Sequence, residues 1–411
     1  MPSTIVIVGA SLAGAHAASA LRDRGHDGAI VLVGAESHLP YQRPGLSKGY
    51  LRGKDGHEEL LVHPEDRYRE LAVDLRLGTR ATAIDTASQR LSVDDGDDIA
   101  YDQLLLATGA RPRIPALPGI DLDGVHYLRT IDDSDALRAR LAPGVHLTIV
   151  GAGWVGSEVA ATARSLGAEV TVLDPLTVPL ESVLGAEIGR AFGVRHTDNG
   201  VDLRAGRLVT GIDGKGGRVT GVRTDGGDVI ETDLVLVAVG AEPNTELAEQ
   251  AGIRVDRGVL VDDRLRTSAP EVYAAGDVAR ADHPRYAEAI RVEHWDNAMQ
   301  QGGFAGSSML GADGVYERVP YFFSTQYDVT IEVTGRPDAT HRLVLRGDPT
   351  DSSFMAFWLQ DNVIQAGLNA NSWGAADTIR GLIESHAQVD AVALADESVP
   401  LDELGQQVTT P

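Results

Sequence analysis

The stretch Thr4-Ile5-Val6-Ile7-Val8-Gly9-Ala10-Ser11-Leu12-Ala13-Gly14 decides the fold of the N-terminal part of the chain. A short apolar run ends in the pattern Gly-x-Ser-x-x-Gly, and an Ala-rich segment (15–21) follows at once, which predicts a strand, a tight turn and a helix. Gly9 permits the turn, the small Ser11 lets the backbone approach a pyrophosphate, and Gly14 lets helix and strand pack closely. The stretch therefore predicts the phosphate-binding turn of a dinucleotide-binding unit.

An acidic residue follows this turn at the distance that a dinucleotide-binding unit requires. The apolar segment 30–33 predicts a second strand, and it leads to Glu36, about twenty residues beyond the glycines, where a ribose hydroxyl would be held. The alternative is an ordinary tight turn between a strand and a helix.

The same pattern recurs in the stretch Leu147-Thr148-Ile149-Val150-Gly151-Ala152-Gly153-Trp154-Val155-Gly156-Ser157-Glu158. This second copy has a full GxGxxG after a strand and before an Ala-rich helix, and its next predicted strand (169–173) ends in Asp174. Two copies with strand, helix and acid in register are a specific signal. The chain is therefore predicted to bind two dinucleotides.

Length and charge limit the classes of partner. The 411 residues suffice for roughly two to three domains with sizeable cores. The 60 acidic and 36 basic residues leave a formal charge of -24, which argues against nucleic acid and against an anionic membrane as partners. No apolar run approaches the ~20 residues of a membrane span. The first predicted strand begins at Thr4, so we expect no signal peptide and a cytoplasmic location.

The sequence contains no cysteine. A chain without thiols has no redox-active disulfide, no thiolate nucleophile and no iron–sulfur cluster bound through its own cysteines. Any redox chemistry must therefore take place on a bound cofactor.

The remaining segments divide the chain into parts. The proline-containing segment 38–48 predicts an ordered loop that carries Arg43 and Lys48, although both could simply be solvated surface residues. Residues 101–110 predict a buried strand followed by a Pro/Gly-rich linker, and residues 234–244 repeat that arrangement. The strand 271–275 closes on Gly276-Asp277, which could be only a turn. Residues 291–297 open the next predicted helix.

From Pro320 onwards the pattern changes to that of an antiparallel sheet. Val329, Ile331 and Val333 alternate with polar residues, and residues 354–359 and 363–368 flank a tight turn at 360–362. A helix is expected at 375–386. These elements predict a third, α+β domain without a cofactor signature of its own.

With these pieces placed, the chain resembles the FAD-dependent ferredoxin reductases that serve bacterial cytochromes P450 and ring-hydroxylating oxygenases. The motifs that carry the resemblance occur in the family's order over essentially the whole chain: the N-terminal fingerprint, PYQRPGLSK (40–48), LLLATGARPR (104–113), GAGWVGSE (151–158), VYAAGDVA (272–279), RVEHWDNA (291–298) and PYFFSTQYD (320–328).

The resemblance implies an α/β, glutathione-reductase-like fold with two Rossmann-type dinucleotide-binding domains and a C-terminal α+β interface domain. It places an FAD-binding domain at 1–113 and 244–318, an NAD-binding domain at 114–243 and the interface domain at 319–411. The chain departs from the family's pattern at three positions. Gly45 stands where members of the family usually carry a second Pro or an Ala, and Phe323 and Thr325 replace the Trp and Asp of the family's FWSDQYD motif.

The resemblance also implies the residues of the site, and it implies no metal. Lys48 would lie close to the flavin ring, Glu158 at the nicotinamide–flavin contact and Trp295 at the exposed side of the flavin; these three are the expected catalytic residues. Glu158 could alternatively be an acid favoured by the helix dipole in a first helical turn, and His294 could be an ordinary core or surface histidine. The full set expected to bind the cofactors is Gly9, Ser11, Leu12, Ala13, Gly14, Glu36, Arg43, Lys48, Ala107, Thr108, Gly109, Arg129, Gly276, Asp277, Glu293, His294 and Trp295, with Gly151, Gly153, Trp154, Val155, Gly156, Glu158, Asp174, Val239 and Gly240.

The function that follows from the resemblance is electron transfer from NADH through non-covalent FAD to a small iron–sulfur ferredoxin, [2Fe–2S] or similar, and indirectly to a cytochrome P450 or dioxygenase. A monomer or weak homodimer is expected. NADH is expected over NADPH, because Asp174 would repel a 2′-phosphate and residues 176–180 carry no charge. Arg291, Arg318, Arg336, Arg342 and Arg346 are candidates for a ferredoxin-docking patch.

Two alternatives stay open at this point. One is an NADH oxidase or small-acceptor reductase on the same scaffold. The other is a redox-sensing interaction protein of the apoptosis-inducing-factor type, which would favour a basic face for nucleic acid and is disfavoured by a sequence pI near 4.8.

Overall fold

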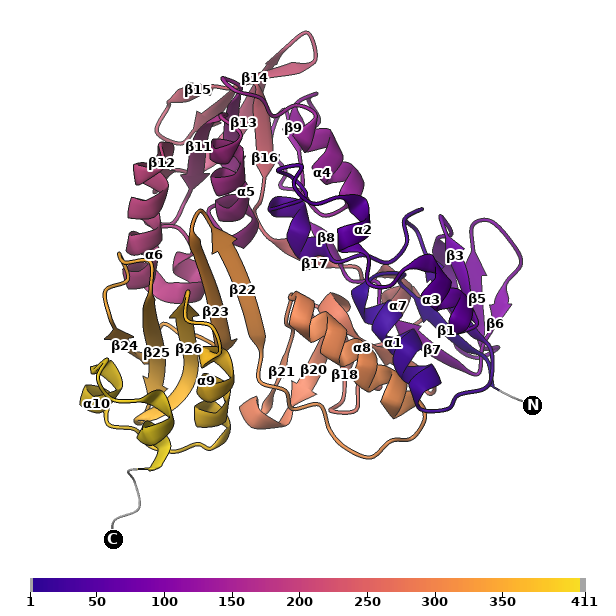
Figure 1. Cartoon of the computed structure of the whole chain (residues 1–411). Helices are drawn as coiled ribbons and strands as arrows, with labels where there is room; N and C mark the ends of the chain where they lie inside the picture. Colours follow the sequence, from indigo (N-terminus) through magenta and orange to yellow (C-terminus); the bar gives the residue numbers. More distant parts are fainter. Residues whose placement is uncertain (1–2, 407–411) are drawn as a thin grey trace. The chain divides into compact units, whose positions relative to one another are not determined.

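The computed structural model describes residues 3–406 (Figure 1). The chain folds into two compact units, each assembled from separate segments. Unit 1 contains residues 1–44, 56–111 and 241–318, and unit 2 contains residues 45–55, 112–240 and 319–411. Among the described residues, no helix combines the length and the apolar character that crossing a membrane requires.

A parallel five-stranded sheet forms the centre of unit 1. Its strand order is β19-β7-β1-β2-β3, and the strands are β1 (Ile5–Val8), β2 (Ile30–Gly34), β3 (Val73–Leu77), β7 (Gln103–Leu106) and β19 (Val272–Ala274). All four residues of β1 are buried, because a central parallel strand is covered on both faces. This explains why the N-terminal run is continuously apolar rather than alternating.

Two long helices of unit 1 pack against each other beside this sheet: α1 (Leu12–Asp23) and α8 (Trp295–Met309). A Cβ added at Gly302 would lie 2.2 Å from the carbonyl oxygen of Ala13, so the close approach of the two helices requires a glycine there. The other elements of unit 1 are the strands β4 (Ala81–Asp85), β5 (Arg90–Val93), β6 (Ile99–Ala100), β18 (Val259–Val261), β20 (Ala279–His283) and β21 (Glu288–Ile290), and the short helices α2 (His57–Leu60), α3 (Glu65–Glu70), α7 (Glu246–Gln250), η2 (Gly276–Val278) and η3 (Pro284–Tyr286).

Unit 2 contains a second parallel five-stranded sheet, of order β12-β11-β10-β16-β9. The strands are β9 (Val125–His126), β10 (His146–Val150), β11 (Glu169–Asp174), β12 (Val201–Ala205) and β16 (Leu234–Val237). Around it lie α4 (Ile131–Arg138), α5 (Trp154–Ser165), α6 (Glu181–Asp198) and an antiparallel sheet of β13 (Val209–Lys215), β14 (Arg218–Thr224) and β15 (Val229–Glu231). Each predicted fingerprint therefore opens a helix next to the central strand of a parallel sheet.

The C-terminal part of unit 2 is an antiparallel sheet of order β22-β23-β26-β25-β24. Its strands are β22 (Tyr321–Gln326), β23 (Val329–Gly335), β24 (Arg342–Arg346), β25 (Phe354–Gln360) and β26 (Val363–Ala370), followed by α9 (Ala375–Glu384), α10 (Ala391–Ala395) and the 3-10 turn η4 (Leu401–Gln406). The hairpin predicted at 360–362 is present, and Asp361 and Asn362 take positive φ values there. The side chain of Arg346 is 8% exposed and donates to four backbone carbonyl oxygens, those of Leu394, Asp396, Glu397 and Val399.

The segments that connect the units differ in detail from the simple loops that the sequence predicts. The linker strands β8 (Ala110–Pro112) and β17 (Ala241–Pro243) pair with each other, and the proline-containing loop includes the 3-10 turn η1 (Arg43–Ser47). This turn is compatible with Pro44, because Pro44 is its second residue and the first N–H groups of a helical turn have no acceptor inside it.

Candidate dinucleotide-binding sites

The first phosphate-binding turn lies between β1 and α1 in unit 1. Gly9 has a φ of +124°, and a Cβ at this position would lie 2.0 Å from the carbonyl oxygen of Ala107, so only glycine fits. A Cβ at Gly14 would lie 2.1 Å from the carbonyl oxygen of Gly9. Ser11 is the N-cap of α1, and its side chain makes no capping hydrogen bond within the described chain. The start of α1 thus keeps backbone N–H groups for an anion, as the pyrophosphate of a dinucleotide requires.

The acid predicted to hold the ribose is part of a small polar cluster. Tyr41 donates to Glu36 Oε2 at 2.5 Å, Arg43 donates to Glu36 Oε1 at 2.9 Å, and Arg43 also donates to the Tyr41 hydroxyl at 2.8 Å. Burial alone would raise the pKa of Glu36, but the Arg43 charge and the two hydrogen bonds outweigh it and lower the pKa below its ordinary value. Glu36 is therefore an ionised acceptor at neutral pH, and a carboxylate with two donors still has lone pairs for a ribose diol.

The Gly-Asp pair after β19 is buried in unit 1. Gly276 has a φ of +80°, its N–H donates to Gln301 Oε1 at 2.9 Å, and Asp277 is 9% exposed. Arg291 donates to the backbone carbonyl of Asp277 at 3.2 Å. A glycine in the left-handed region and a buried aspartate make this an ordered structural feature rather than a solvent-exposed turn.

The second phosphate-binding turn, in unit 2, repeats the geometry of the first. Gly151 has a φ of +106°, and a Cβ there would lie 2.3 Å from the carbonyl oxygen of Ala238, while a Cβ at Gly156 would lie 2.0 Å from that of Gly151. Gly153, the N-cap of α5, is different: an added Cβ would meet no described atom within 4 Å. The protein's own packing does not require a glycine at position 153, so the open space in front of α5 fits a pyrophosphate that approaches the backbone closely.

Two carboxylates organise the loop that follows β11. Asp174 accepts hydrogen bonds from the N–H groups of Ala152 at 2.7 Å and Leu176 at 2.8 Å. Glu181 Oε2 accepts from the Thr177 N–H at 2.7 Å, the Thr177 hydroxyl at 2.8 Å and the Val178 N–H at 3.2 Å. These hydrogen bonds, that of the Thr177 hydroxyl first, lower the pKa of Glu181. These backbone N–H groups are thus already bonded to two carboxylates. Two negative charges at this loop fit a ribose diol better than a 2′-phosphate, because they would repel the phosphate.

A buried ion pair joins two of the predicted catalytic residues within unit 2. Lys48 Nζ lies 2.7 Å from Glu158 Oε2, and the two side chains are 17% and 7% exposed. The Ser47 hydroxyl donates to the same oxygen at 2.5 Å, and the Ser324 hydroxyl donates to Glu158 Oε1 at 2.7 Å. Because α5 begins at Trp154, Glu158 lies beyond the first turn of the helix, where the helix dipole contributes little. Three side-chain donors therefore converge on the Glu158 carboxylate, which an ordinary helix-start role does not explain.

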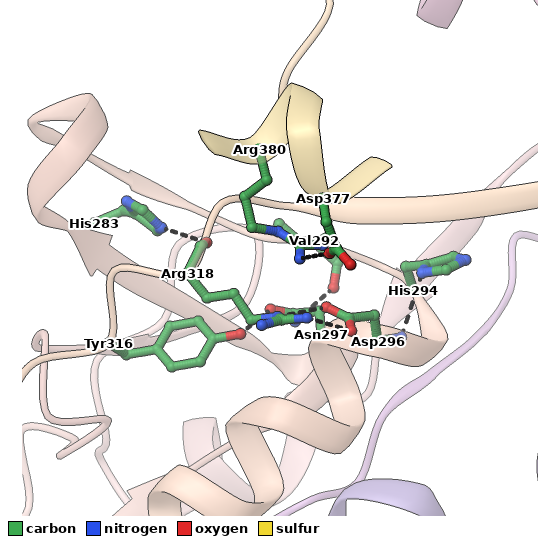
Figure 2. A network of polar contacts seen from close by, with 9 residues as sticks. All are labelled: His283, Val292, His294, Asp296, Asn297, Tyr316, Arg318, Asp377 and Arg380. Carbon is green, nitrogen blue, oxygen red and sulfur yellow. Dashed lines mark hydrogen bonds and ion pairs between the residues drawn. The ribbon is translucent and has the colours of Figure 1, made fainter. Parts of the chain in front are cut away.

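Trp295 is fixed at the start of α8 in unit 1. Its indole Nε1 donates to Gln42 Oε1 at 2.8 Å. His294 is the N-cap of the helix and accepts from the Asp296 N–H through Nδ1, which gives it a structural role. Figure 2 shows the polar network behind this helix start: Arg318 binds both oxygens of Asp296 at 2.8 and 2.9 Å, and Tyr316 donates to Asn297, which donates to the carbonyl of Val292.

The other predicted cofactor-binding residues take several positions. Thr108 exchanges hydrogen bonds with Asn244 in unit 1, and Asn244 also donates through its backbone to Gly109. The backbone N–H of Arg129 donates to Asp133, the N3 residue of the capping box of α4, and Glu293 pairs with Arg291. The remaining members lie in or beside the two turns: Leu12, Ala13 and Ala107 are buried, Val155 is 39% exposed, and Val239 and Gly240 follow β16. Trp154 instead packs edge-on against Phe322, with 4.6 Å between the ring centroids.

One of the arginines predicted to form a docking patch is wrongly placed for that role. Arg346 is 8% exposed, and its guanidinium donates hydrogen bonds to backbone carbonyl oxygens. Arg318 and Arg291 are engaged with Asp296 and Glu293. Arg336 and Arg342 are exposed, and their part in a docking patch stays a prediction. The sequence does not distinguish exposed from buried arginines here, because it does not show whether a guanidinium reaches solvent or folds back on carbonyl oxygens.

Four residues of these clusters were not assigned a role from the sequence: Tyr41, Gln42, Ser47 and Ser324. The first three lie inside the PYQRPGLSK motif and the fourth inside PYFFSTQYD, so the motifs themselves were the available signal. Within the described part of the chain, no group of three or more His, Asp or Glu side chains is arranged to hold a metal ion.

The comparisons with known proteins identify the family. Residues 3–302 match the family model described as pyridine nucleotide-disulphide oxidoreductase, and residues 321–405 match the model described as reductase C-terminal. The chain therefore belongs to the pyridine nucleotide-disulphide oxidoreductase family. Its lack of cysteine sets it apart from the disulphide chemistry in that name.

Individual relatives place the chain more narrowly. It is 40% identical over 398 residues to the ferredoxin–NAD(+) reductase component of the anthranilate 1,2-dioxygenase system from Burkholderia cepacia, covering 96% of this chain and 98% of that one. It is 35% identical over 405 residues to putidaredoxin reductase from Pseudomonas putida, covering 97% and 96%. The predicted resemblance to oxygenase-coupled ferredoxin reductases is thus confirmed.

Solved structures agree with the sequence relatives. The structure of a covalent putidaredoxin reductase–putidaredoxin complex matches with a TM-score of 0.95 at 34% identity, covering 98% of this chain and 99% of that one. The ferredoxin reductase for the CYP199A2 system from Rhodopseudomonas palustris matches with a TM-score of 0.95 at 35% identity, covering 98% and 100%. The predicted fold class, two Rossmann-type domains with a C-terminal α+β domain, is confirmed.

Proposed function

We propose that this chain is an FAD-dependent NADH:ferredoxin oxidoreductase that supplies electrons, through a small iron–sulfur ferredoxin, to a cytochrome P450 or a ring-hydroxylating dioxygenase. The observation that carries the proposal is the presence of two phosphate-binding turns in a chain without cysteine. Two dinucleotides provide a hydride donor and a flavin, and the missing thiols leave the flavin as the site of redox chemistry. The names of the relatives, which are ferredoxin reductase components, support the choice of acceptor.

The two turns are assigned to different cofactors. Unit 1 supplies the FAD contacts, with the turn at Gly9, the Glu36–Arg43 pair and Asp277. The turn at Gly151 and the acid Asp174 in unit 2 supply the NADH contacts. The domain boundaries that go with this assignment are 1–113 and 244–318 for FAD, 114–243 for NAD and 319–411 for the C-terminal domain.

When bound, FAD accepts two electrons as a hydride and releases them one at a time. The chain's own residues bind and orient: the two turns hold pyrophosphates on backbone N–H groups, and Glu36 and Asp174 accept hydrogen bonds from ribose hydroxyls. Lys48 and Glu158 are assigned to the flavin ring and to the nicotinamide–flavin contact, and Trp295 to the exposed side of the flavin. Gln42 holds the Trp295 indole in one orientation.

The partner is a ferredoxin, [2Fe–2S] or similar, and the oxygenase is reached only through it. The further expectations of a cytoplasmic location and of a monomer or weak homodimer stay predictions. The oxidase alternative gains no specific support, since the water-forming NADH oxidase from Lactobacillus brevis matches at 22% identity and shares the fold alone. The interaction-protein alternative gains no specific support either.

The experiment that tests the proposal combines cofactor analysis with an acceptor panel. The purified protein should be yellow and should release free FAD on denaturation. With NADH it should reduce one or more members of a panel of purified ferredoxins faster than it consumes oxygen. Isolation of FMN, flavin that stays with the precipitated chain, or oxygen consumption that outpaces every ferredoxin would contradict the proposal.

A single glycine variant sharpens the test. Gly153→Val adds a side chain into open space, so we expect the chain to fold and to keep FAD, but to lose NADH-driven reduction because the pyrophosphate can no longer approach. Gly381→Ala, which also adds a Cβ into open space but lies in α9, is the matched control and should behave like the wild type. Normal NADH turnover in Gly153→Val would show that the second turn does not bind the coenzyme.

A further inference from the structure

The strand β22 has a buried polar face that the proposed function does not explain. Phe322, Ser324 and Gln326 alternate with Phe323 and Thr325, so the first three lie on one face of the strand. Ser324 and Gln326 are each 1% exposed. A hydroxyl and an amide that are buried so completely require hydrogen-bond partners, and their partners reveal what this face contacts.

This face is in register with α5, the helix that opens at the second phosphate-binding turn. The Phe322 ring packs against Trp154, and the Ser324 hydroxyl donates to Glu158. Two residues along a strand advance by about 6.7 Å, and four residues along a helix advance by about 6.0 Å. Phe322 and Ser324 therefore contact residues of α5 that lie one helical turn apart. This register of β22 places the Ser324 hydroxyl opposite the Glu158 carboxylate.

Ser324 and its neighbours fix the orientation of the Glu158 carboxylate at both oxygens. Oε2 accepts from Ser47 at 2.5 Å and from Lys48 at 2.7 Å, whereas Ser324 is the donor to Oε1 at 2.7 Å. Gln326 Nε2 lies 3.4 Å from the Ser324 hydroxyl oxygen and donates to it, which directs the hydroxyl proton towards Glu158. Without Ser324 the carboxylate would be held at one oxygen and could rotate about its terminal torsion.

We infer that Ser324 is a positioning residue for the hydride step, in which NADH is oxidised to NAD+ and FAD takes up the hydride. It holds the carboxylate of Glu158 in one orientation, so the C-terminal part of the chain takes part on the coenzyme side of the reaction. The inference rests on the proposed function, because it takes Glu158 to be the residue at the nicotinamide–flavin contact.

The test compares three variants of the FAD-loaded protein. Ser324→Ala removes the donor, Ser324→Thr keeps a hydroxyl, and Thr325→Ala is the matched control, since it removes a hydroxyl from the opposite face of the same strand, where Thr325 bonds to Thr330 at 2.9 Å. The measurements are the rate of flavin bleaching by NADH in a stopped-flow experiment, the Kd of NAD+ by calorimetry, and the thermal unfolding midpoint.

We expect Ser324→Ala to slow flavin bleaching about tenfold and to weaken NAD+ binding severalfold, with recovery to within about twofold in Ser324→Thr. Thr325→Ala should keep the wild-type rate and Kd even if its unfolding midpoint falls as much as that of Ser324→Ala. A purely structural hydroxyl would lower the midpoint and leave rate and Kd unchanged, which would overturn the inference, as would a slow rate that Ser324→Thr does not restore.

A second variant keeps the inference falsifiable if Ser324→Ala does not fold. Gln326→Leu keeps the side-chain volume and removes the donor that directs the Ser324 hydroxyl, so it should slow bleaching about two- to fivefold; an unchanged rate would overturn the inference. Failure of the proposed function gives a different result. A wild-type protein that bleaches with NADH and reduces no ferredoxin contradicts the acceptor, while the comparison between variants still decides the role of Ser324.

Discussion

Lys48 Nζ lies 2.7 Å from Glu158 Oε2 in a buried ion pair. The resemblance places this lysine close to the flavin ring, and in the structure a carboxylate compensates its positive charge. A cation beside a redox centre stabilises the form that carries more electrons, and an adjacent anion reduces this effect. Under the proposed assignment of both residues to the flavin, the two charges act on its potential together.

Opposite shifts in the flavin midpoint potential are expected when either partner of this pair is removed. Lys48→Met leaves an anion and should lower the potential, whereas Glu158→Gln leaves a cation and should raise it. Each shift should be on the order of tens of millivolts, since 30 mV corresponds to about 1.4 kcal/mol for a two-electron couple. Spectroelectrochemical titration measures both. Shifts of the same sign would contradict the assignment of the pair to the flavin.

Coenzyme preference should depend on both carboxylates of the loop after β11. A repulsion or lost hydrogen bond of roughly 1.5–3 kcal/mol corresponds to about ten- to a hundredfold in binding, so the wild type should favour NADH by about that factor in kcat/KM. Glu181→Gln keeps an acceptor for the Thr177 N–H and removes the charge, and should reduce the preference severalfold. Glu187→Gln on the same helix is the charge-matched control.

The coenzyme comparison has two informative negative results. Equal kcat/KM values for NADH and NADPH in the wild type would show that the loop does not discriminate. A ratio that changes in neither Asp174→Asn nor Glu181→Gln would show that other residues set the preference.

The Arg318–Asp296 pair should matter for stability because Asp296 is buried. Its side chain is 6% exposed, and Arg318→Leu would leave this carboxylate without its bidentate partner, at a cost of about 3–5 kcal/mol. The thermal unfolding midpoint of the FAD-loaded protein should fall by several degrees, and Arg318→Leu/Asp296→Asn should recover much of the loss. Arg264→Leu, which breaks the exposed pair with Asp313, should change little. Equal losses in the two single variants would contradict this account.

Acid should destabilise unit 2 through His196. Burial lowers the pKa of His196 to about 4 in the folded chain, below its ordinary value of 6.5. The neutral imidazole thus contributes stability that is fully present above pH 6.5 and is lost as the pH falls from 6.5 to 4, with a maximum of about 3 kcal/mol. The unfolding midpoint of His196→Gln should depend less on pH over this range. His386→Asn changes an exposed histidine and should keep the wild-type pH dependence. Unfolding midpoints measured from pH 7 to pH 4 check this; parallel curves for wild type and His196→Gln would contradict it.

Ferredoxin docking should depend on local charge and not on the overall charge of -24. Raising ionic strength from low values should first help ferredoxin reduction, because repulsion from an acidic partner is screened, and should then hurt it as local pairs weaken. Charge reversal of the exposed Arg336 and Arg342 should slow ferredoxin reduction and leave NADH-to-ferricyanide turnover unchanged. If both activities fall together, or neither changes, these arginines do not form the docking surface.

Much of this protein could be predicted from sequence because its main signals are local. The turns at Gly9 and Gly151 need a glycine in the left-handed region directly after a buried strand, and the acids Glu36 and Asp174 follow at a fixed distance along the chain. A parallel strand that is covered on both faces must be continuously apolar, so the two Rossmann-type units were visible without any tertiary information. The absence of cysteine also excluded disulfide chemistry directly.

Tertiary structure alone decided how the polar side chains pair. Arg43 and Lys48 lie five positions apart in one loop, yet the chain passes from unit 1 to unit 2 between them, so Arg43 binds Glu36 and Lys48 binds Glu158. The partners Ser324 and Glu158 are 166 positions apart, and Arg346 folds back on carbonyls up to 53 positions away. A hydrogen bond needs atoms within about 3 Å, and only the packing of distant segments sets such distances. The local pattern of one segment does not determine which distant side chain it will meet.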